Sequence, residues 1–245
     1  MEAILVGDVF SSVLRGLRTL VSEARWHFKE EGLHSRAVDP ANVAMVIVDV
    51  SRENMEAYSI DEETVVGVDV NRIYDIAKSI KKNELVELQV EDETRLKVKF
   101  GSVEYRVTLI DPAAIRKEPK IPQLDLPAKI VLDAGEFKKA ITAANKISDQ
   151  VVFRSDETGF YIEAEGDVDK ITFHMSDAEL IEFNKAEARS MFGIEYLLEF
   201  CKVAGSGDLL TIYLGTDYPV RLVFDVADGK VKVEYILAPR LEREM

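Results

Sequence analysis

The sequence predicts an α+β protein built from two similar domains, each with two helices packed on antiparallel sheets. The sequence contains an internal repeat: Phe10 matches Phe137 at an offset of 127 residues, and Phe100 matches Phe224 at an offset of 124. A period this long exceeds the roughly 20–50 residues of solenoid repeats and is typical of a duplicated domain. The expected strands come in runs interrupted by single helices, unlike the alternating strands and helices of nucleotide-binding folds.

In the first repeat, an opening strand leads into an amphipathic helix. Phe10, Leu14 and Leu17 recur at helical spacing, and Asp8 stands where an N-cap residue is expected. The same spacing predicts a second helix around Ile73. The expected strands of this repeat are 2–6, 24–29, 32–38, 43–50, 64–70, 85–91, 96–100 and 103–110.

A proline-rich segment separates the two repeats. It holds four of the seven prolines, from Pro112 to Pro127. Proline fixes φ and has no amide donor, so this segment is predicted to be an extended linker outside any sheet interior. The predicted organisation is a first domain, a connecting linker and a second domain, at residues 1–116, 117–128 and 129–245.

The second repeat restarts with the same order of elements. Its first helix carries Phe137 and Ile141, and its second helix carries Ile194 and Leu197, again at helical spacing. The expected strands of this repeat are 129–132, 151–155, 159–164, 170–176, 187–192, 209–214, 220–226 and 230–237.

The composition describes an acidic protein with enough apolar residues for two cores. Hydrophobic residues make up 47% of the 245, and the net charge of −14 argues on average against a nucleic-acid partner. No apolar run is long enough for a membrane span, and no signal-peptide pattern opens the chain. The single cysteine, Cys201, excludes a disulfide within the chain. We therefore expect a soluble, cytoplasmic protein.

Positive charge is nevertheless expected on the polar faces of the helices. On the first helix this face carries Ser12, Arg15 and Thr19, and its repeat partner carries Lys139 and Lys146. Basic helices without interleaved aromatic residues indicate phosphate contact without base reading, while an ordinary solvated face is the alternative. The candidates for this contact are Arg15, Arg18, Lys78, Lys81, Lys82, Lys138, Lys139, Lys146 and Lys202.

No pattern in the sequence indicates catalysis. His27, His34 and His174 fall in separate expected strands without the spacing of metal ligands. The segment 205–210 begins like a dinucleotide-binding fingerprint, but it lacks the third glycine and runs from helix to strand. We therefore predict no catalytic residue, no metal site and no cofactor.

Several short motifs follow one another along the chain: Val38-Asp39, Ile121-Pro122, Gly135-Glu136-Phe137, Tyr218-Pro219-Val220 and Leu237-Ala238-Pro239. Taken in order, they resemble one family over the whole chain: the proliferating cell nuclear antigens, which are the DNA sliding clamps of archaea and eukaryotes. The single cysteine and the high charge are closer to archaeal members.

This resemblance implies the DNA clamp fold and a ring of three chains joined head to tail, with helices lining the hole. It also implies that the edge strand 103–110 of one subunit pairs with the edge strand 170–176 of the next. Ser11 and Ser12 stand where many members have lysine, which makes the inner surface less basic. The implied interface residues are Val103, Tyr105, Val107, Leu109, Lys170, Thr172 and His174.

The resemblance further implies a hydrophobic pocket for short partner peptides of the form Gln-x-x-aliphatic-x-x-aromatic-aromatic. For Val43 and Met45, the alternative to a place in the pocket is a place in the core under their strand. The tail after Pro239 is expected to add a short strand to the bound peptide. The implied pocket residues are Val38, Val43, Met45, Pro119, Ile121, Pro122, Pro219, Ile236, Ala238 and Pro239.

The function implied by the resemblance is non-enzymatic. A homotrimeric clamp would encircle duplex DNA during replication and repair, and would tether DNA polymerase, flap endonuclease and ligase after loading by a clamp loader. Two alternatives stay open: a two-domain enzyme with an active site between the domains, and an acidic peptide-binding scaffold that never contacts DNA.

Overall fold

The computed structural model describes residues 1–92 and 94–240, which divide into two compact units. Unit 1 consists of residues 1–120 and 226–233, and unit 2 consists of residues 121–225 and those from 234 onward. Within the described ranges, no helix is both long and apolar enough to cross a membrane.

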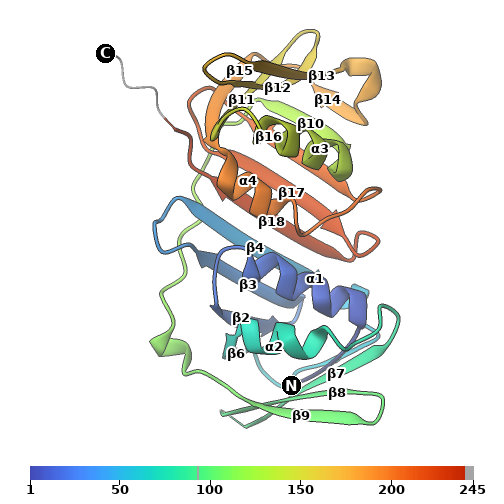
Figure 1. Cartoon of the computed structure of the whole chain (residues 1–245). Coiled ribbons are helices and arrows are strands. Elements are labelled where there is room, and N and C mark those ends of the chain that lie inside the picture. The colour runs from blue at the N-terminus through green and yellow to red at the C-terminus, as the bar shows by residue number, and fades with distance from the viewer. Residues whose placement is uncertain (93, 241–245) are drawn as a thin grey trace. The chain divides into compact units, whose positions relative to one another are not determined.

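Unit 1 has two helices, α1 (Gly7–Arg18) and α2 (Val70–Ala77), which lie side by side in Figure 1. One of its sheets has the order β5-β1-β7-β8-β9, and the strands β4-β3-β2-β6 run next to one another in the other. The strands are β1 (Glu2–Val6), β2 (Glu23–Lys29), β3 (Gly32–Val38), β4 (Ala44–Ser51), β5 (Ala57–Ser59), β6 (Thr64–Asp69), β7 (Leu85–Asp92), β8 (Arg95–Phe100) and β9 (Val103–Thr108).

Unit 2 repeats this plan with α3 (Ala134–Ala144) packed beside α4 (Ile194–Phe200). One sheet has the order β13-β12-β11-β15, and the strands β14-β10-β16-β17 run next to one another in the other. The strands are β10 (Ala128–Asp133), β11 (Gln150–Asp156), β12 (Gly159–Glu165), β13 (Lys170–Ser176), β14 (Glu182–Asn184), β15 (Ala188–Gly193), β16 (Leu209–Leu214), β17 (Val220–Val226) and β18 (Val231–Leu237), of which β18 is divided between the two units.

The predicted helices and strands are present, with small differences at their ends. Sequence reasoning missed β5 and β14, because three residues are too few to display an alternating pattern. The prediction of Asp8 as an N-cap is wrong, since α1 is capped by Val6 and Asp8 lies in its first turn. Aspartate does cap the other two long helices: Asp69 accepts from the amide of Arg72, and Asp133 accepts from two amides of α3.

The duplicated positions form equivalent cores in the two units. Phe10 contacts Trp26 edge to face in unit 1, with ring centroids 6.4 Å apart. At the repeat offset, Phe137 contacts Phe153 in the same way, with centroids 5.8 Å apart. All four rings are fully buried, so the sequence repeat marks the core of each unit. Cys201 is also buried, and burial raises the pKa of its thiol to about 12.

A glycine opens the second strand of an equivalent hairpin in each unit, Gly32 in β3 and Gly159 in β12. Gly32 has φ +135, and a Cβ atom there would lie 2.1 Å from the carbonyl oxygen of Val50. At Gly159 the corresponding distance to the carbonyl oxygen of Met175 is 2.2 Å. Both positions therefore require glycine, because the neighbouring backbone occupies the space of a side chain.

We expect Gly32→Ala to lower the free energy of unfolding by about 3 kcal/mol, since it adds a backbone clash to a conformation that only glycine adopts readily. The measurement is denaturant unfolding followed by circular dichroism. Gly205→Ala is the matched control, because the nearest atom to a Cβ there is 3.9 Å away. A loss of less than 1 kcal/mol for Gly32→Ala would contradict the argument.

Candidate functional site

The basic candidates gather at the helices, but only four of them lie inside one: Arg15 and Arg18 in α1, and Lys138 and Lys139 in α3. The helices end earlier than the apolar spacing suggested, so the prediction of a helical position is wrong for Lys81, Lys82, Lys146 and Lys202, whereas Lys78 is the C-cap of α2 with helical backbone angles. The positions just after a helix favour cations, because a helix C-terminus carries a partial negative charge. The residues that follow a helix are Lys78 and, further along the chain, Lys81, Lys82, Lys146 and Lys202.

Ser12 also departs from the predicted polar face of α1. Its side chain is fully buried, and its hydroxyl accepts a hydrogen bond of 2.7 Å from Nη2 of Arg15. Arg15 lies 3.6 Å from a carboxylate oxygen of Asp8, and the other oxygen of Asp8 lies 3.2 Å from Nζ of Lys82. Asp8 therefore partly neutralises two of the candidate cations of unit 1.

Three further candidates have a carboxylate partner one helical turn away. Nζ of Lys78 lies 2.6 Å from Asp75, and this hydrogen bond lowers the pKa of the Asp75 carboxyl. Lys139 lies 3.5 Å from Glu136, and Lys202 pairs with Glu199. Such exposed pairs are weak, so a phosphate group can replace the carboxylate at little cost.

The other four candidates have no carboxylate within ion-pair distance in the described ranges. Lys81, Lys138 and Lys146 are exposed and form no ion pair there. Arg18 donates to Oδ1 of Asn71 at 3.1 Å and lies over the ring of Tyr74, 4.6 Å from its centroid. The full charge of the three lysines is available to an external anion, whereas Arg18 also interacts with the Asp75 carboxylate and contributes to lowering its pKa.

The candidate interface strands are the outermost strands of their sheets. In β9, Val103 and Tyr105 are 40% and 41% exposed, whereas the side chain of Val107 is buried, as is that of Leu109 just after the strand. Residues two apart in a strand share a face, so the buried face of β9 at Val107 continues into an uncovered apolar face at Tyr105 and Val103.

On the other edge strand, β13, the candidates Lys170, Thr172 and His174 are exposed and share one face. The imidazole of His174 stacks on the ring of Tyr161, with centroids 4.2 Å apart and planes 14° from parallel. The guanidinium of Arg154 also contacts the ring of Tyr161, 3.7 Å from its centroid. The side chains of His174, Tyr161 and Arg154 on this edge are therefore held in place by one another.

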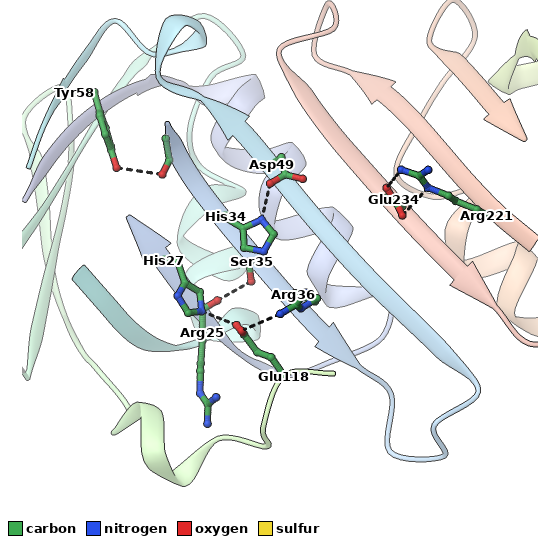
Figure 2. Close-up of polar contacts among 11 residues, drawn as sticks. Arg25, His27, His34, Ser35, Arg36, Asp49, Tyr58, Glu118, Arg221 and Glu234 are labelled. Carbon is green, nitrogen blue, oxygen red and sulfur yellow. Dashed lines mark hydrogen bonds and ion pairs between the residues drawn. The ribbon is translucent and has the colours of Figure 1, made fainter. Parts of the chain in front are cut away.

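Residues 112–118, which lead into the linker, are tied to the strands of unit 1 by side chains that sequence reasoning left without a role. Figure 2 shows the contacts of one of these residues, Glu118. Nε of Arg25 donates to the carbonyl of Pro112 at 2.8 Å, and its Nη2 donates to the carbonyl of Ile115 at 2.7 Å. Nε2 of His27 lies 2.6 Å from Oε1 of Glu118. A signal was present in the sequence, since Arg25 and His27 are two residues apart on one strand face.

A second group of contacts joins the linker to the loop between β3 and β4. The guanidinium of Arg116 donates to the carbonyl of Asp39 at 2.9 Å and to Oδ1 of Asn42 at 2.6 Å. The buried carboxylate of Asp39 in turn accepts from the amides of Val43 and Ala44, both at 2.8 Å. Asp39, noted in the sequence only as part of a motif, thus shapes the loop.

The candidate pocket residues belong to both units. In unit 1, Val38, Val43 and Pro119 are half-buried, and Met45 is buried, as expected for the strand-core alternative. The proposed tail strand, residues 241–245, lies outside the described residues. In unit 2, Ile121 and Pro122 are exposed, Ile236 is buried, and the residues with intermediate exposure are Pro219, Ala238 and Pro239.

Two family models match this chain in succession. The N-terminal domain of proliferating cell nuclear antigen matches residues 1–104, and the C-terminal domain matches residues 120–240. Together they cover both repeats.

Individual proteins agree with the family models over the full length. A DNA polymerase sliding clamp of Archaeoglobus fulgidus is 69% identical over 244 residues, which is 100% of each chain. The structure of the C-terminal region of FEN-1 bound to A. fulgidus PCNA aligns with a TM-score of 0.97 at 70% identity, over 99% of each chain. The PCNA2-PCNA3 complex of Sulfolobus tokodaii aligns at 0.87 and 26% identity, over 99% of this chain and 100% of that one. This chain therefore belongs to the proliferating cell nuclear antigen family.

Proposed function

We propose that three copies of this chain close head to tail into a ring that encircles duplex DNA, as a DNA polymerase sliding clamp. The observation that carries the proposal is the match to a sliding clamp at 69% identity, over 100% of each chain. The edge strands β9 and β13 support ring closure, because each has one unpaired row of backbone donors and acceptors. Pairing β9 of one copy with β13 of the next satisfies both rows by a heterologous contact that closes.

Contact with DNA is proposed for the four unpaired cations and, more weakly, for the five that already have a carboxylate partner. Lysine and arginine at helix ends offer charge to phosphate without reading bases, so the contact is independent of sequence. The net charge of −14 leaves the remaining surface strongly acidic, which disfavours DNA elsewhere on the molecule. Topology holds such a ring on the duplex, and weak phosphate contacts let it slide.

Partner proteins are proposed to dock through short peptides at the pocket candidates bordered by the linker. The relative from A. fulgidus, at 70% identity, is seen with the C-terminal region of FEN-1 bound. We extend this to DNA polymerase, flap endonuclease, ligase and the clamp loader, through the motif Gln-x-x-aliphatic-x-x-aromatic-aromatic. The ring would work in the cytoplasm on chromosomal DNA.

No chemistry is proposed for this chain. The histidines of unit 1 already have structural partners: His27 contacts Glu118, and Nδ1 of His34 lies 2.6 Å from Asp49. Within the described ranges, no group of histidine, cysteine, aspartate and glutamate could hold a metal ion. The alternatives, a two-domain enzyme and an acidic scaffold, remain the competing outcomes of the functional test.

The test is polymerase extension on primed templates, with a clamp loader and ATP present. On a closed circle we expect product length to increase strongly on addition of this chain. On a linear template with free ends the increase should be far smaller, because the ring slides off. Equal stimulation of both templates, or a monomeric mass by light scattering, would contradict a ring that is held by topology.

A further inference from the structure

We propose that Arg25 and Arg116 are positioning residues for the docking of partner peptides. They hold residues 112–118, the end of the first domain and the start of the linker, against the strands of unit 1 without touching the peptide themselves. This inference rests on the proposed peptide-docking function. All the contacts that carry it lie within unit 1, and Figure 2 shows those that His27 and Arg36 make with Glu118.

Arg25 acts on the linker backbone. Its guanidinium bonds two carbonyls, those of Pro112 and Ile115, with distances of 2.8 Å and 2.7 Å. The planar guanidinium binds two carbonyl oxygens that are three residues apart. It therefore fixes the conformation of the turn between them and the distance of that turn from β2. Because the linker has no sheet partner, these side-chain bonds take the place of a ladder.

Packing fixes the same turn independently. Ile115 is buried, and a Cβ atom built on Gly67 of β6 would lie only 2.8 Å from Cδ1 of Ile115. The isoleucine side chain therefore occupies the space that a larger residue at position 67 would fill. The turn at 112–115 is held by hydrogen bonds on its backbone and by a close-packed side chain.

Arg116 extends the anchoring to the loop that separates two pocket candidates. It holds the carbonyl of Asp39 and the side chain of Asn42, and this loop connects Val38 to Val43. Asn42 has φ +58, a conformation that asparagine tolerates better than most residues. Losing Arg116 releases the linker and the loop from each other at the edge of the proposed pocket.

The anchored stretch ends immediately before the first linker residue of the pocket. Glu118 lies between His27, at 2.6 Å, and Nη2 of Arg36, at 3.8 Å. From Pro119 to Leu124, a stretch that is fully described, the chain forms no hydrogen bond or ion pair. The unanchored segment is thus a short span that starts from a fixed point, which limits the conformations that a peptide must select.

Removal of an anchor should act mainly on association. If the linker is docked only about a tenth of the time, the apparent Kd rises about tenfold, because the peptide binds only the docked fraction. Since the bound complex keeps its own contacts, the dissociation rate should change by less than about twofold. Substituting a residue that touches the peptide gives the opposite pattern: the dissociation rate rises and the association rate changes little.

The experiment measures association and dissociation rates for a peptide from the C-terminal region of FEN-1 on the full-length chain. We expect Arg25→Ala and Arg116→Ala each to weaken binding about tenfold through slower association, and Arg25→Lys to restore part of the loss. Arg95→Ala, which removes an exposed arginine of β8 whose side chain forms no hydrogen bond or ion pair with residues 112–118, is the matched control. Unfolding midpoints and molar masses should match those of the unaltered chain.

The outcomes separate this inference from the function it rests on. Unchanged affinity in both variants, a change confined to the dissociation rate, or an equal loss in Arg95→Ala would overturn the positioning role while leaving peptide docking intact. Absence of binding by the unaltered chain would overturn peptide docking, and the positioning role with it. Arg116 is exposed, so its variant does not depend on core packing for folding.

Discussion

A chain carrying Val103→Glu and Tyr105→Glu is expected to lose the ring and to have the mass of one subunit, 27.6 kDa, by light scattering. The unaltered chain is expected to have three times that mass. Polymerase processivity on circular templates should fall to the level seen without a clamp. This is the largest effect we expect from any substitution outside the two cores.

The reason lies in the uncovered part of the β9 face. Val107 is buried in unit 1, yet Val103 and Tyr105 on the same face are 40% and 41% exposed, and Tyr105 stacks on Phe100 at 6.2 Å. A subunit that pairs with this edge covers them. Loss of a buried aromatic anchor costs about 2 kcal/mol or more, which weakens each contact about 30-fold. Two buried glutamates without partners add to that cost.

Val65→Glu is the control for this pair of substitutions. Val65 is 42% exposed in β6, so it undergoes the same chemical change outside the proposed interface. We expect it to remain a trimer with unchanged processivity. A trimeric V103E/Y105E chain would show that β9 does not form the subunit contact.

Charge reversal at Lys138 and Lys146 is expected to reduce loading onto DNA about tenfold while the trimer stays intact. Both lysines are exposed, and neither has a carboxylate partner among the described residues, so their charge is fully available to phosphate. Each phosphate contact that is lost should lower the salt dependence of binding by about 0.9 in the log–log slope. The loss should be equal for all DNA sequences.

The measurement is the yield of loaded clamp on nicked circular DNA, with a clamp loader, over a series of salt concentrations. A chain with Arg95→Glu and Lys185→Glu has the same net charge as K138E/K146E and is the matched control. Lys185 pairs with Asp177 in unit 2, and Arg95 lies in strand β8 of unit 1, so neither residue belongs to a helix. Equal losses in the two chains would point to net charge and not to contact at α3.

Periodicity in the sequence was sufficient to predict the cores and all the elements except the short strands β5 and β14. Phe10 and Phe137, matched by the repeat, are both fully buried on the apolar faces of equivalent helices. Apolar spacing is a local property, and burial of one face is its direct consequence, so the two helix–sheet layers could be predicted from neighbouring residues alone. The motifs of the family added the edge strands β9 and β13, each of which is outermost in its sheet.

The polar contacts could not be predicted in the same way. The amphipathic pattern placed Ser12 on a polar face, but the serine is buried under Arg15, and most of the lysines follow the helices. Helix ends depend on capping and on the loop that follows, for which the apolar pattern carries little information. The preference of aspartate for N-cap positions predicted Asp8 as the cap, whereas the N-cap of α1 is Val6.

The sequence by itself thus determined the duplication, the elements, the buried faces and the family. Only the tertiary structure decided which charges are free and where the linker is fixed. The partners of Arg25 are 87 and 90 residues away along the chain, and Glu118 is 91 residues from His27. Contacts over such separations arise when folded strands bring distant side chains within hydrogen-bond distance, so no local pattern encodes them.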